Sequence, residues 1–548
     1  MKYQGKTEEA YDFFYKACWN AAWQDAGYYS LAQLSAARGD WEEALYEIDK
    51  SLLRNWHNLR GRHLKAAILR HLGRKDEALA LIEDSLRIDR CGFEKYLITG
   101  VEADLKELLA LMRPEAHNYE ELALDYASAG CWEEALMAAE TAIGQNVSGQ
   151  TMLHYYKSWF LIQLDRKEEA LAAIREAEQQ LPDCCFPNVL EAILALQSVI
   201  GFATETPKAL YYLGNLWYDK RQYPEAITCW ETSMQQDDTF PTVLRNLSLA
   251  YFNKLNRQEE AVTLLEKAFA LDMTDARILM ELDQLYKRLN CSHEDRLAFL
   301  EKHKDIAFQR DDLYLEYVTL LNQLGQYEEA IRMIDARKFH PWEGGEGKVP
   351  AQYQLARVEL VKQLLAEKKY EEALALIEEC FIYPHNLGEG KLYGAQENDF
   401  NYYKACALSG LGRKEEATEL FLAASIGNSQ PAAAMYYNDQ KPDKIFYQGL
   451  ALRKLEREEE ARGRFNNLIS YGEKHLYDVF KMDYFAVSLP DLQIWEDDMN
   501  KKNRIHCNYL MALGHLGLGN NEKAMKYFDI AAEMDNNHQG VQIHQKMI

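Results

Sequence analysis

The clearest structural signal in the sequence is Tyr28-Tyr-Ser-Leu-Ala-Gln-Leu-Ser-Ala-Ala-Arg-Gly-Asp-Trp-Glu-Glu-Ala-Leu-Tyr-Glu-Ile-Asp-Lys-Ser51. A turn followed by two acidic residues separates two segments with helical apolar periodicity, which predicts a helix, a turn and a second helix. The small residues Ala32 and Ala44 would let the two helices approach closely, and Leu31 and Ile48 would fill the space between successive pairs. Neither helix can bury its apolar stripe alone, so such pairs must stack on one another.

The helix start of this stretch recurs along the chain. A turn, acidic residues and then an alanine occur at Ala10, Ala44, Ala78, Ala135, Ala170, Ala226, Ala261, Ala330, Ala373, Ala417, Ala461 and Ala524. Four of the eleven spacings are 34 or 35 residues, and one, of 69, is nearly twice that. Nine of these alanines follow a Glu-Glu pair. Such pairs complement the positive end of a helix dipole, so we interpret them as structural and not catalytic.

The repeated pattern resembles the tetratricopeptide repeat (TPR), a helix-turn-helix unit of 34 residues. Further units of the same kind are Tyr119-x-x-Leu122-Ala123-x-x-Tyr126 and Leu213-Gly214-x-x-Trp217. The resemblance covers nearly the whole chain and implies an all-α fold, a right-handed α-solenoid (superhelix) of about twelve or thirteen TPR-like helix pairs. It also implies a non-catalytic scaffold whose concave face binds a protein or peptide. Because the chain is acidic, we expect a bound segment to carry basic or apolar residues.

Irregular spacings divide the array into segments. The predicted order is TPR-like repeats at 1–90, an inserted helix at 91–114, repeats at 115–204 with an inserted helix near 187–199, repeats at 205–324, lengthened repeats at 325–470, an aromatic and acidic insertion at 471–503, and a last repeat with a capping tail at 504–548.

The first repeat begins with its second helix. Tyr11, Phe14 and Tyr15 are apolar residues of that helix, and no first helix of the unit precedes them. Because an array needs a polar capping element at its end, we expect that Met1 lies inside a longer natural protein, or that another chain covers this end.

Composition excludes several classes of function. The formal net charge of −24 repels phosphate backbones, so a nucleic-acid partner is not expected. No signal peptide and no apolar run long enough to span a membrane are found. Ten cysteines without a Cys-x-x-Cys spacing predict free thiols in a reducing compartment, the cytoplasm. No cofactor is expected.

One phrase occurs in two neighbouring repeats: His340-Pro-Trp-Glu-Gly-Gly-Glu-Gly-Lys348 and His385-Asn-Leu-Gly-Glu-Gly-Lys391. It is not a phosphate-binding loop, because no strand precedes it and Lys348 is followed by Val349. We predict two adjacent loops whose polar and aromatic groups form a ligand pocket. The candidate binding residues are His340, Trp342, Glu343, Glu346, Lys348, His385, Asn386, Glu389, Lys391, Glu397, Asn398 and Trp495.

The alternative is that the loops turn tightly and pack on one another, with Lys348 and Lys391 pairing with Glu346 and Glu389. Glu343 with Glu346 or Glu389 could supply the two carboxylates of a glycosidase, but loops on a helical array seldom hold such a pair rigidly. We therefore expect no catalysis by this chain alone. His340 and His385 share no ligand spacing with other His or Cys residues, so no metal site is predicted.

The loop phrases carry a narrower resemblance. Together with Gly394-Ala-Gln-Glu-Asn398 and Asp491-Leu-Gln-Ile-Trp-Glu-Asp-Asp498, they are similar to the C-terminal repeat region of a bacterial protein family. In that family a β-sandwich domain similar to aldose epimerases precedes the repeats, and no such domain is recognised here. The resemblance implies a carbohydrate-related role or a partner domain. Convergence of the loop residues on an open pocket would favour a sugar site, and mutual burial would favour the plain scaffold.

Overall fold

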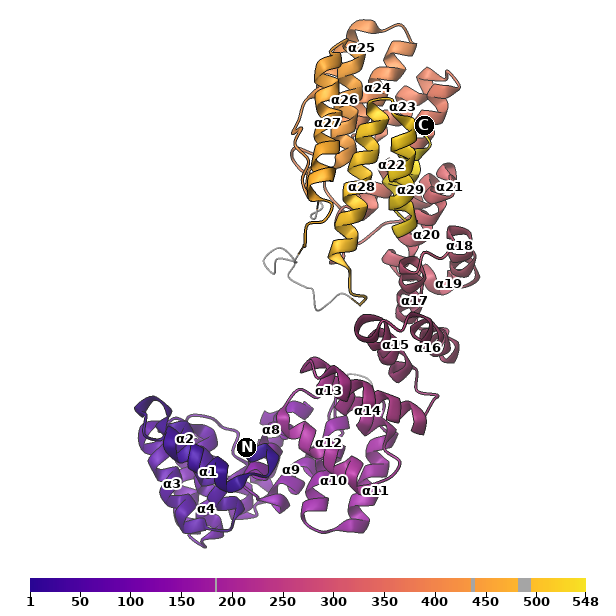
Figure 1. The fold of residues 1–548 in the computed structure, drawn as a ribbon. Coiled ribbons are helices and arrows are strands. Elements are labelled where there is room, and N and C mark those ends of the chain that lie inside the picture. The colour runs from indigo at the N-terminus through magenta and orange to yellow at the C-terminus, as the bar shows by residue number, and fades with distance from the viewer. Residues whose placement is uncertain (183–184, 435–438, 481–493) are drawn as a thin grey trace. The chain divides into compact units, whose positions relative to one another are not determined.

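A computed structural model of the chain describes residues 1–182, 185–434, 439–480 and 494–548. All regular structure in these residues is helical, apart from one isolated bridge between Glu115 and Ser148. The chain forms two compact units, unit 1 at Met1–Ala250 and unit 2 at Tyr251–Ile548 (Figure 1). The predicted all-α solenoid of TPR-like repeats is thereby confirmed. The predicted insertion at 471–503 falls partly on 481–493, which lie outside the described residues.

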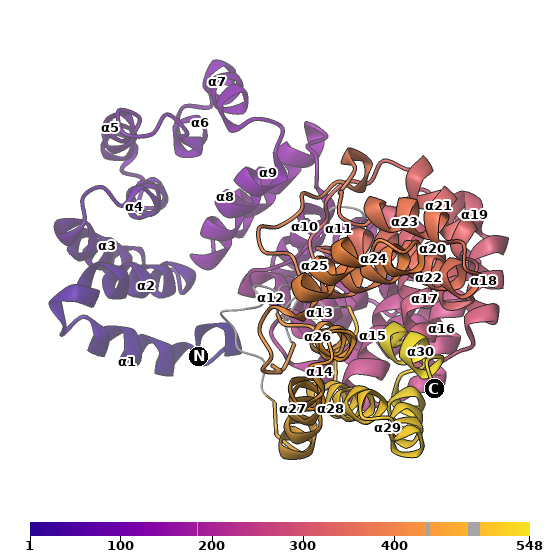
Figure 2. The same cartoon turned by 90° about the horizontal axis from the view of Figure 1, so that it is seen from above.

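Unit 1 begins with two short 3-10 helices, η1 (Lys2–Gln4) and η2 (Ala21–Trp23), which lie before and after the first α-helix. Its α-helices are α1 (Thr7–Ala17), α2 (Gln24–Ala37), α3 (Trp41–Arg54), α4 (Leu59–His71), α5 (Lys75–Ser85), α6 (Phe93–Thr99), α7 (Glu102–Met112), α8 (Ala116–Ser128), α9 (Trp132–Gly144), α10 (Thr151–Gln163), α11 (Lys167–Gln179), α12 (Leu190–Phe202), α13 (Pro207–Asp219), α14 (Tyr223–Gln236) and the first part of α15 (Pro241–Leu255). Helices α2 to α9 follow one another in a curved row (Figure 2).

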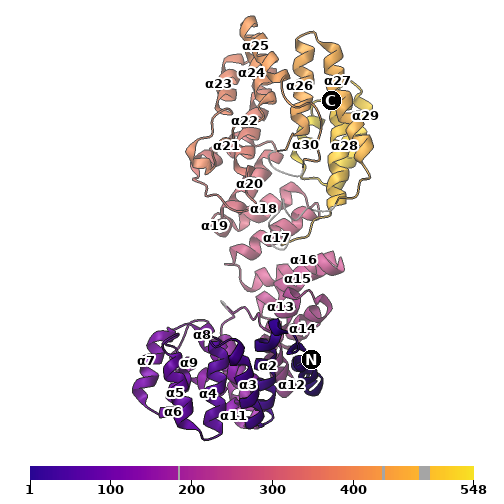
Figure 3. The same cartoon turned by 90° about the vertical axis from the view of Figure 1, so that its left-hand side faces the viewer.

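Unit 2 continues the array from the end of α15. Its helices are α16 (Gln258–Leu271), α17 (Ala276–Arg288), α18 (His293–Lys302), α19 (Lys304–Ala307), α20 (Asp311–Gln323), α21 (Tyr327–Ala336), α22 (Lys348–Ala366), α23 (Tyr370–Glu379), the 3-10 helix η3 (His385–Leu387), α24 (Asn398–Gly410), α25 (Lys414–Ser425), α26 (Pro442–Lys454), α27 (Glu458–His475), α28 (Met499–Gly517), α29 (Asn521–Met534) and α30 (Gln539–Gln545). Successive helices pack against one another, most extensively α27 on α28, α28 on α29 and α24 on α25 (Figure 3).

The turn of every repeat contains one residue with left-handed backbone. It lies five positions before the repeat alanine, and it is a glycine in Gly5, Gly39, Gly73, Gly130, Gly325, Gly412 and Gly519 but another residue in Asp165, Arg221, Asn256, Lys368 and Glu456. Its φ angle lies between 53° and 81° throughout. This conformation ends the first helix of a pair, and glycine adopts it without the steric cost that a Cβ brings.

The repeat alanines are buried in the helical array. The most exposed of the twelve, Ala417, is 3% exposed. In the repeat of α13 and α14 the two helices approach closely, because a Cβ on Gly214 would lie 2.4 Å from the indole of Trp230. Small residues at one position and a large side chain opposite therefore fix the spacing within a pair.

Five repeats share an ion pair at the start of their second helix. An arginine four residues before the repeat alanine binds a glutamate one residue before it, in the pairs Arg74–Glu77, Arg166–Glu169, Arg257–Glu260, Arg413–Glu416 and Arg457–Glu460. The glutamates lie in the first turn, where the helix dipole favours a negative charge. These acidic residues are structural elements of the repeat.

The first helices leave aromatic side chains in solvent. Phe13 and Tyr15 of α1 are 54% and 51% exposed, and Trp19 and Trp23 after it are 75% and 61% exposed. The expectation that a partner covers this end stays a prediction. Among the described residues, no helix is both long enough and apolar enough to cross a membrane.

Candidate binding site

The paired loops of residues 340–391 contact each other mainly through backbone atoms. The Phe339 N–H donates to the Asn386 carbonyl oxygen at 2.8 Å, and the Gly347 N–H donates to the Glu389 carboxylate at 2.7 Å. At Gly388, φ is +76°, and an added Cβ would lie 2.7 Å from the Phe339 carbonyl oxygen. The two loops are therefore packed against one another at close range.

Asn386 holds the second loop to the helix before the first. Its side-chain amide donates to the carbonyl oxygens of Ile334 at 3.0 Å and Arg337 at 3.1 Å, both at the end of α21. His340 lies at the outer edge, where its side chain is 76% exposed and its ring nitrogen lies 3.2 Å from the Asp311 carboxylate. The half-buried amide has a structural role, and the histidine is accessible to solvent.

The ion pair of Lys391 differs from the one with Glu389 that the sequence suggested. Lys391 forms an ion pair with Glu397 and donates to the Phe381 carbonyl oxygen, while Glu389 receives the backbone N–H of Gly347. Glu343, Glu346, Lys348 and His385 are exposed, and Trp342 is half-buried against Gly345.

Two further candidates are buried in structural contacts. The Asn398 amide donates to the carbonyl oxygens of Ala424 and Ile426, each at 2.8 Å. Trp495 is 1% exposed, and its indole N–H donates to the Glu281 carbonyl oxygen at 3.1 Å. Trp495 therefore packs against α17 and is not one of the exposed loop residues. Ten of the twelve candidates thus lie in the two loops or the segment that follows them, whereas Asn398 and Trp495 are held in the structural contacts described above.

The end of the chain covers surfaces of α22 and α28, which we call the inner face of unit 2. Helix α30 lies between α22 and α28 (Figure 3). His544 of α30 is 1% exposed, and its ring lies 5.6 Å from that of Phe446 and 5.9 Å from that of Tyr447. Burial lowers the pKa of His544 to about 4, so this imidazole is neutral near pH 7.

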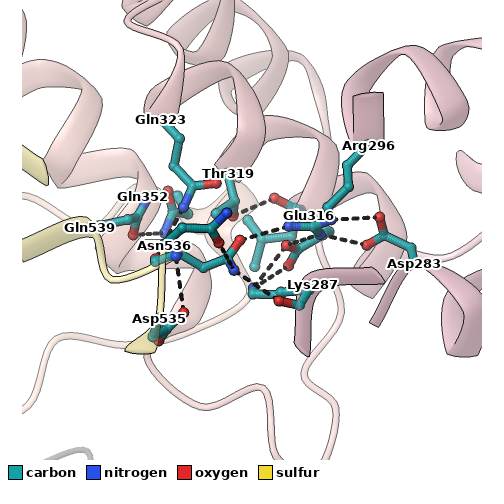
Figure 4. Close-up of polar contacts among 12 residues, drawn as sticks. Asp283, Lys287, Arg296, Glu316, Thr319, Gln323, Gln352, Asp535, Asn536 and Gln539 are labelled. Atoms are coloured by element: carbon teal, nitrogen blue, oxygen red, sulfur yellow. Dashed lines mark hydrogen bonds and ion pairs between the residues drawn. The ribbon is translucent and has the colours of Figure 1, made fainter. Parts of the chain in front are cut away.

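A buried polar cluster fastens the segment before α30 to earlier helices (Figure 4). Arg296 of α18 is fully buried and binds the carboxylates of Asp283 at 2.8 Å and Glu316 at 2.7 Å. Its third contact is the Asn537 side-chain oxygen, at 2.9 Å. Burial would raise the pKa of Glu316, but the charges of Lys287 and Arg296 outweigh it and lower that pKa to about 2. We call these five residues the closing cluster.

Unit 1 holds an open pocket of about 850 Å³, which we call the inner pocket. Helices α2, α4, α8, α10 and α12 contribute to its wall, together with η1. Its aromatic lining is Tyr3, Tyr29, Tyr156 and Phe186, its carboxyl groups are Glu115, Glu120, Glu121, Asp125 and Glu191, and its cationic groups are Lys2 and Arg60. It is an acidic pocket with aromatic surfaces.

Polar contacts hold the wall of the inner pocket in place. Arg60 of α4 binds Asp125 of α8 through two guanidinium nitrogens, so both charges are already compensated. At the N-terminus, Lys2 donates to the Gln33 side-chain oxygen at 2.9 Å, and the Tyr3 hydroxyl donates to the Glu191 carboxylate. The N-terminal segment therefore bridges α2 and α12.

Glu120 is the carboxyl group of the pocket with the most altered acidity. It is half-buried on α8, and burial raises its pKa to about 7, against a smaller opposing effect of His117. Phe186 provides the most accessible apolar surface nearby, with 82% of the residue exposed. A cationic group of a ligand would favour the ionised form of Glu120. An apolar group of a ligand would cover the exposed ring of Phe186.

The inner pocket was not predicted from the sequence. Its lining residues are spread from Lys2 to Glu191, and no motif joins them. The available signal was the inserted helix predicted near 187–199, which is α12 and forms one wall of the pocket.

The chain is similar to solved tetratricopeptide repeat structures at low sequence identity and low TM-score. No protein-family model matches the chain. Among solved structures, it is similar to the TPR domain of P58(IPK), at 14% identity and a TM-score of 0.21 over 73% of this chain and 98% of that one. A tetratricopeptide repeat protein from Parabacteroides merdae matches at 15% identity and a TM-score of 0.24, over 55% and 98%. YrrB, a TPR protein with an unusual peptide-binding site, matches at 16% and 0.17, over 43% and 96%. At these values no residue role or ligand is carried over to this chain.

Proposed function

We propose that this chain is a non-catalytic repeat scaffold that binds a segment of a partner protein in the inner pocket of unit 1. The observation that carries the proposal is the contrast between an open inner pocket in unit 1 and an inner face of unit 2 that α30 occupies. The free cysteines of the chain support a reducing compartment such as the cytoplasm.

The pocket's lining favours a basic and partly apolar segment. Asp125 is neutralised by Arg60, which leaves four carboxyl groups and one lysine, Lys2, to set the local charge. A lysine or arginine side chain of the partner would lower the cost of ionising Glu120. An apolar side chain would cover the ring of Phe186. The volume suits a few side chains and not a folded domain.

The test is fluorescence anisotropy with two labelled peptides, one alternating lysine and leucine and one alternating glutamate and leucine. We expect saturable binding of the lysine peptide, at least tenfold tighter than that of the glutamate peptide. Phe186→Ala and Glu120→Gln should each weaken it several-fold. The matched controls are Phe13→Ala and Glu168→Gln, which change an exposed phenylalanine and an exposed glutamate of unit 1 outside the pocket.

Equal binding of the two peptides would contradict the proposed chemistry. Binding that both pocket variants leave unchanged would contradict the proposed place. Each result is read against the far-ultraviolet circular dichroism of the same variant, so that a loss of folding is not taken for a loss of binding.

A second candidate function is sugar binding by the loops at 340–398. The accessible side chains of His340 and His385 on two adjacent loops, and the fully exposed ring of Tyr393, support it. The measurement is tryptophan fluorescence against a panel of mono- and oligosaccharides. A saturable change that Trp342→Ala removes and Trp19→Ala retains would support a sugar site, whereas no response from the parent chain would count against it.

A further inference from the structure

Three side chains of the types that bind transition metals converge at the start of α9. The ligand atoms of His71, Cys131 and Glu134 all lie within 4.8 Å of one another. The His71 Nε2 atom lies 3.0 Å from a Glu134 carboxylate oxygen and 3.9 Å from the Cys131 sulfur. These separations are close to the distances between ligands of one tetrahedral zinc ion, whose bonds are about 2.0–2.3 Å long.

This repeat differs from five of the others at the positions of their Arg–Glu pair. Cys131 lies four residues before the repeat alanine, where five other repeats have the arginine of an exposed Arg–Glu pair. Glu134 is the glutamate of that pair, and here it is buried. In place of the missing arginine it contacts His71 and Arg70, both at the end of α4. The repeat's ordinary surface pair is thus replaced by a buried Cys and Glu beside a histidine.

The cluster is held in place by its neighbours. The His71 ring stacks on Trp41, with ring centroids 4.1 Å apart and planes within 1° of parallel. Arg70 donates to Glu134 at 2.8 Å and also binds the buried carboxylate of Glu94. Glu134 is thereby held by both His71 and Arg70. A ligand set ordered by contacts of this kind is already close to its binding geometry.

The charges of the cluster also accommodate a divalent cation. With Cys131 as a thiolate and Glu134 as a carboxylate, the ligand set carries two negative charges, which an ion of charge +2 balances.

We propose that His71, Cys131 and Glu134 bind one divalent transition-metal ion of the zinc class, with water as the fourth ligand. The ligand set combines one sulfur, one nitrogen and one oxygen, which suits a borderline-soft ion. On binding, the Cys131 proton passes to solvent and a metal–sulfur bond forms. His71 binds the ion through Nε2 and carries its proton on Nδ1. The direct contact between His71 and Glu134 is then replaced by a bond from each side chain to the ion. The ion would join the end of α4 to the start of α9.

Cobalt(II) titration of the full chain tests the site, because tetrahedral cobalt–thiolate centres absorb characteristically. We expect a thiolate-to-cobalt charge-transfer band that saturates at one equivalent and disappears when zinc is added. Cys131→Ser should abolish the band, and His71→Ala should weaken binding at least tenfold. Cys91→Ala is the matched control, since Cys91 is another free cysteine of unit 1, and it should leave the titration unchanged.

A second measurement needs no variant. Zinc should slow alkylation of Cys131 by iodoacetamide at least tenfold, mapped by mass spectrometry, and should leave the rate at Cys91 unaltered. The absence of a charge-transfer band in the parent chain, or a band that persists in Cys131→Ser, would overturn the proposal. Equal protection of both cysteines would also overturn it.

Discussion

The two units are built from the same repeat, and they differ in what lies on their inner faces. Unit 1 has an open pocket with half-buried Glu120 and exposed Phe186 in its lining. In unit 2, α30 packs against α22, α26 and α28, and the closing cluster holds the preceding segment to α17, α18 and α20. A repeat therefore fixes how helices pair, whereas a segment that returns from the end of the array determines whether a surface is available for binding.

The largest expected effect comes from opening the closing cluster. Arg296→Met would leave the buried carboxylate of Asp283 without its partner, which costs about 3–5 kcal/mol of unfolding free energy in unit 2. Hydrogen exchange measured by mass spectrometry should accelerate in α17, α18 and α30 and remain unchanged in α8 to α11. Arg332→Met, which removes an exposed pair with Glu329, is the control. Equal acceleration in both units would refute a cluster that acts on unit 2 alone.

The second prediction concerns acid sensitivity and His544. Its pKa is about 4 in the folded chain and about 6.5 when unfolded, so its contribution to stability is full above pH 6.5 and is lost as pH falls toward 4. The loss amounts to about 3 kcal/mol. His544→Phe should remove most of this difference between pH 7 and pH 4, measured by denaturant unfolding with exchange in α30 as the readout.

His57→Gln, which changes an exposed histidine of unit 1, should leave that pH dependence intact. An unaltered acid response in His544→Phe would show that another group controls the closure of unit 2.

The third prediction concerns the pH dependence that Glu120 gives to the stability of unit 1. Glu120 has its pKa raised to about 7, so unit 1 loses stability as pH rises from about 4.5, the ordinary value, to 7. Glu120→Gln should therefore stabilise unit 1 at pH 8 by about 1–3 kcal/mol and have no effect below pH 4.5. Denaturant unfolding at the two pH values measures it, with Glu168→Gln as the control. If Glu120→Gln instead destabilised unit 1 at pH 8, the ionisation of Glu120 would not be what destabilises this unit.

The smallest effect is expected where the units are alike. Arg74→Met in unit 1 and Arg457→Met in unit 2 each remove an exposed Arg–Glu pair at a helix start. Because solvent screens such pairs, both changes should shift the unfolding midpoint little and by similar amounts. A marked difference between them would mean that the repeat itself, and not only its inner face, differs between the units.

Much of the fold could be predicted from single residues and their spacing. The repeat alanines are buried, and the helical array is confirmed. The binding site could not be predicted in the same way. The phrase around His340 and His385 was the most unusual local pattern, yet the structure uses Asn386 and Gly388 to pack its loops together. Local patterns indicate turns and helix starts, but they do not indicate which side chains meet across repeats.

The sequence alone determined the helices, the turns and the pairing, because these depend on periodicity and on side-chain size within some 35 residues. Which side chains face one another across repeats follows from the packing of the whole array. His71 and Cys131 are 60 residues apart in sequence, and Arg296 and Asn537 are 241 apart. Such contacts depend on how successive pairs stack and where the chain returns, so the inner pocket, the closing cluster and the proposed metal site become visible only when the array is assembled.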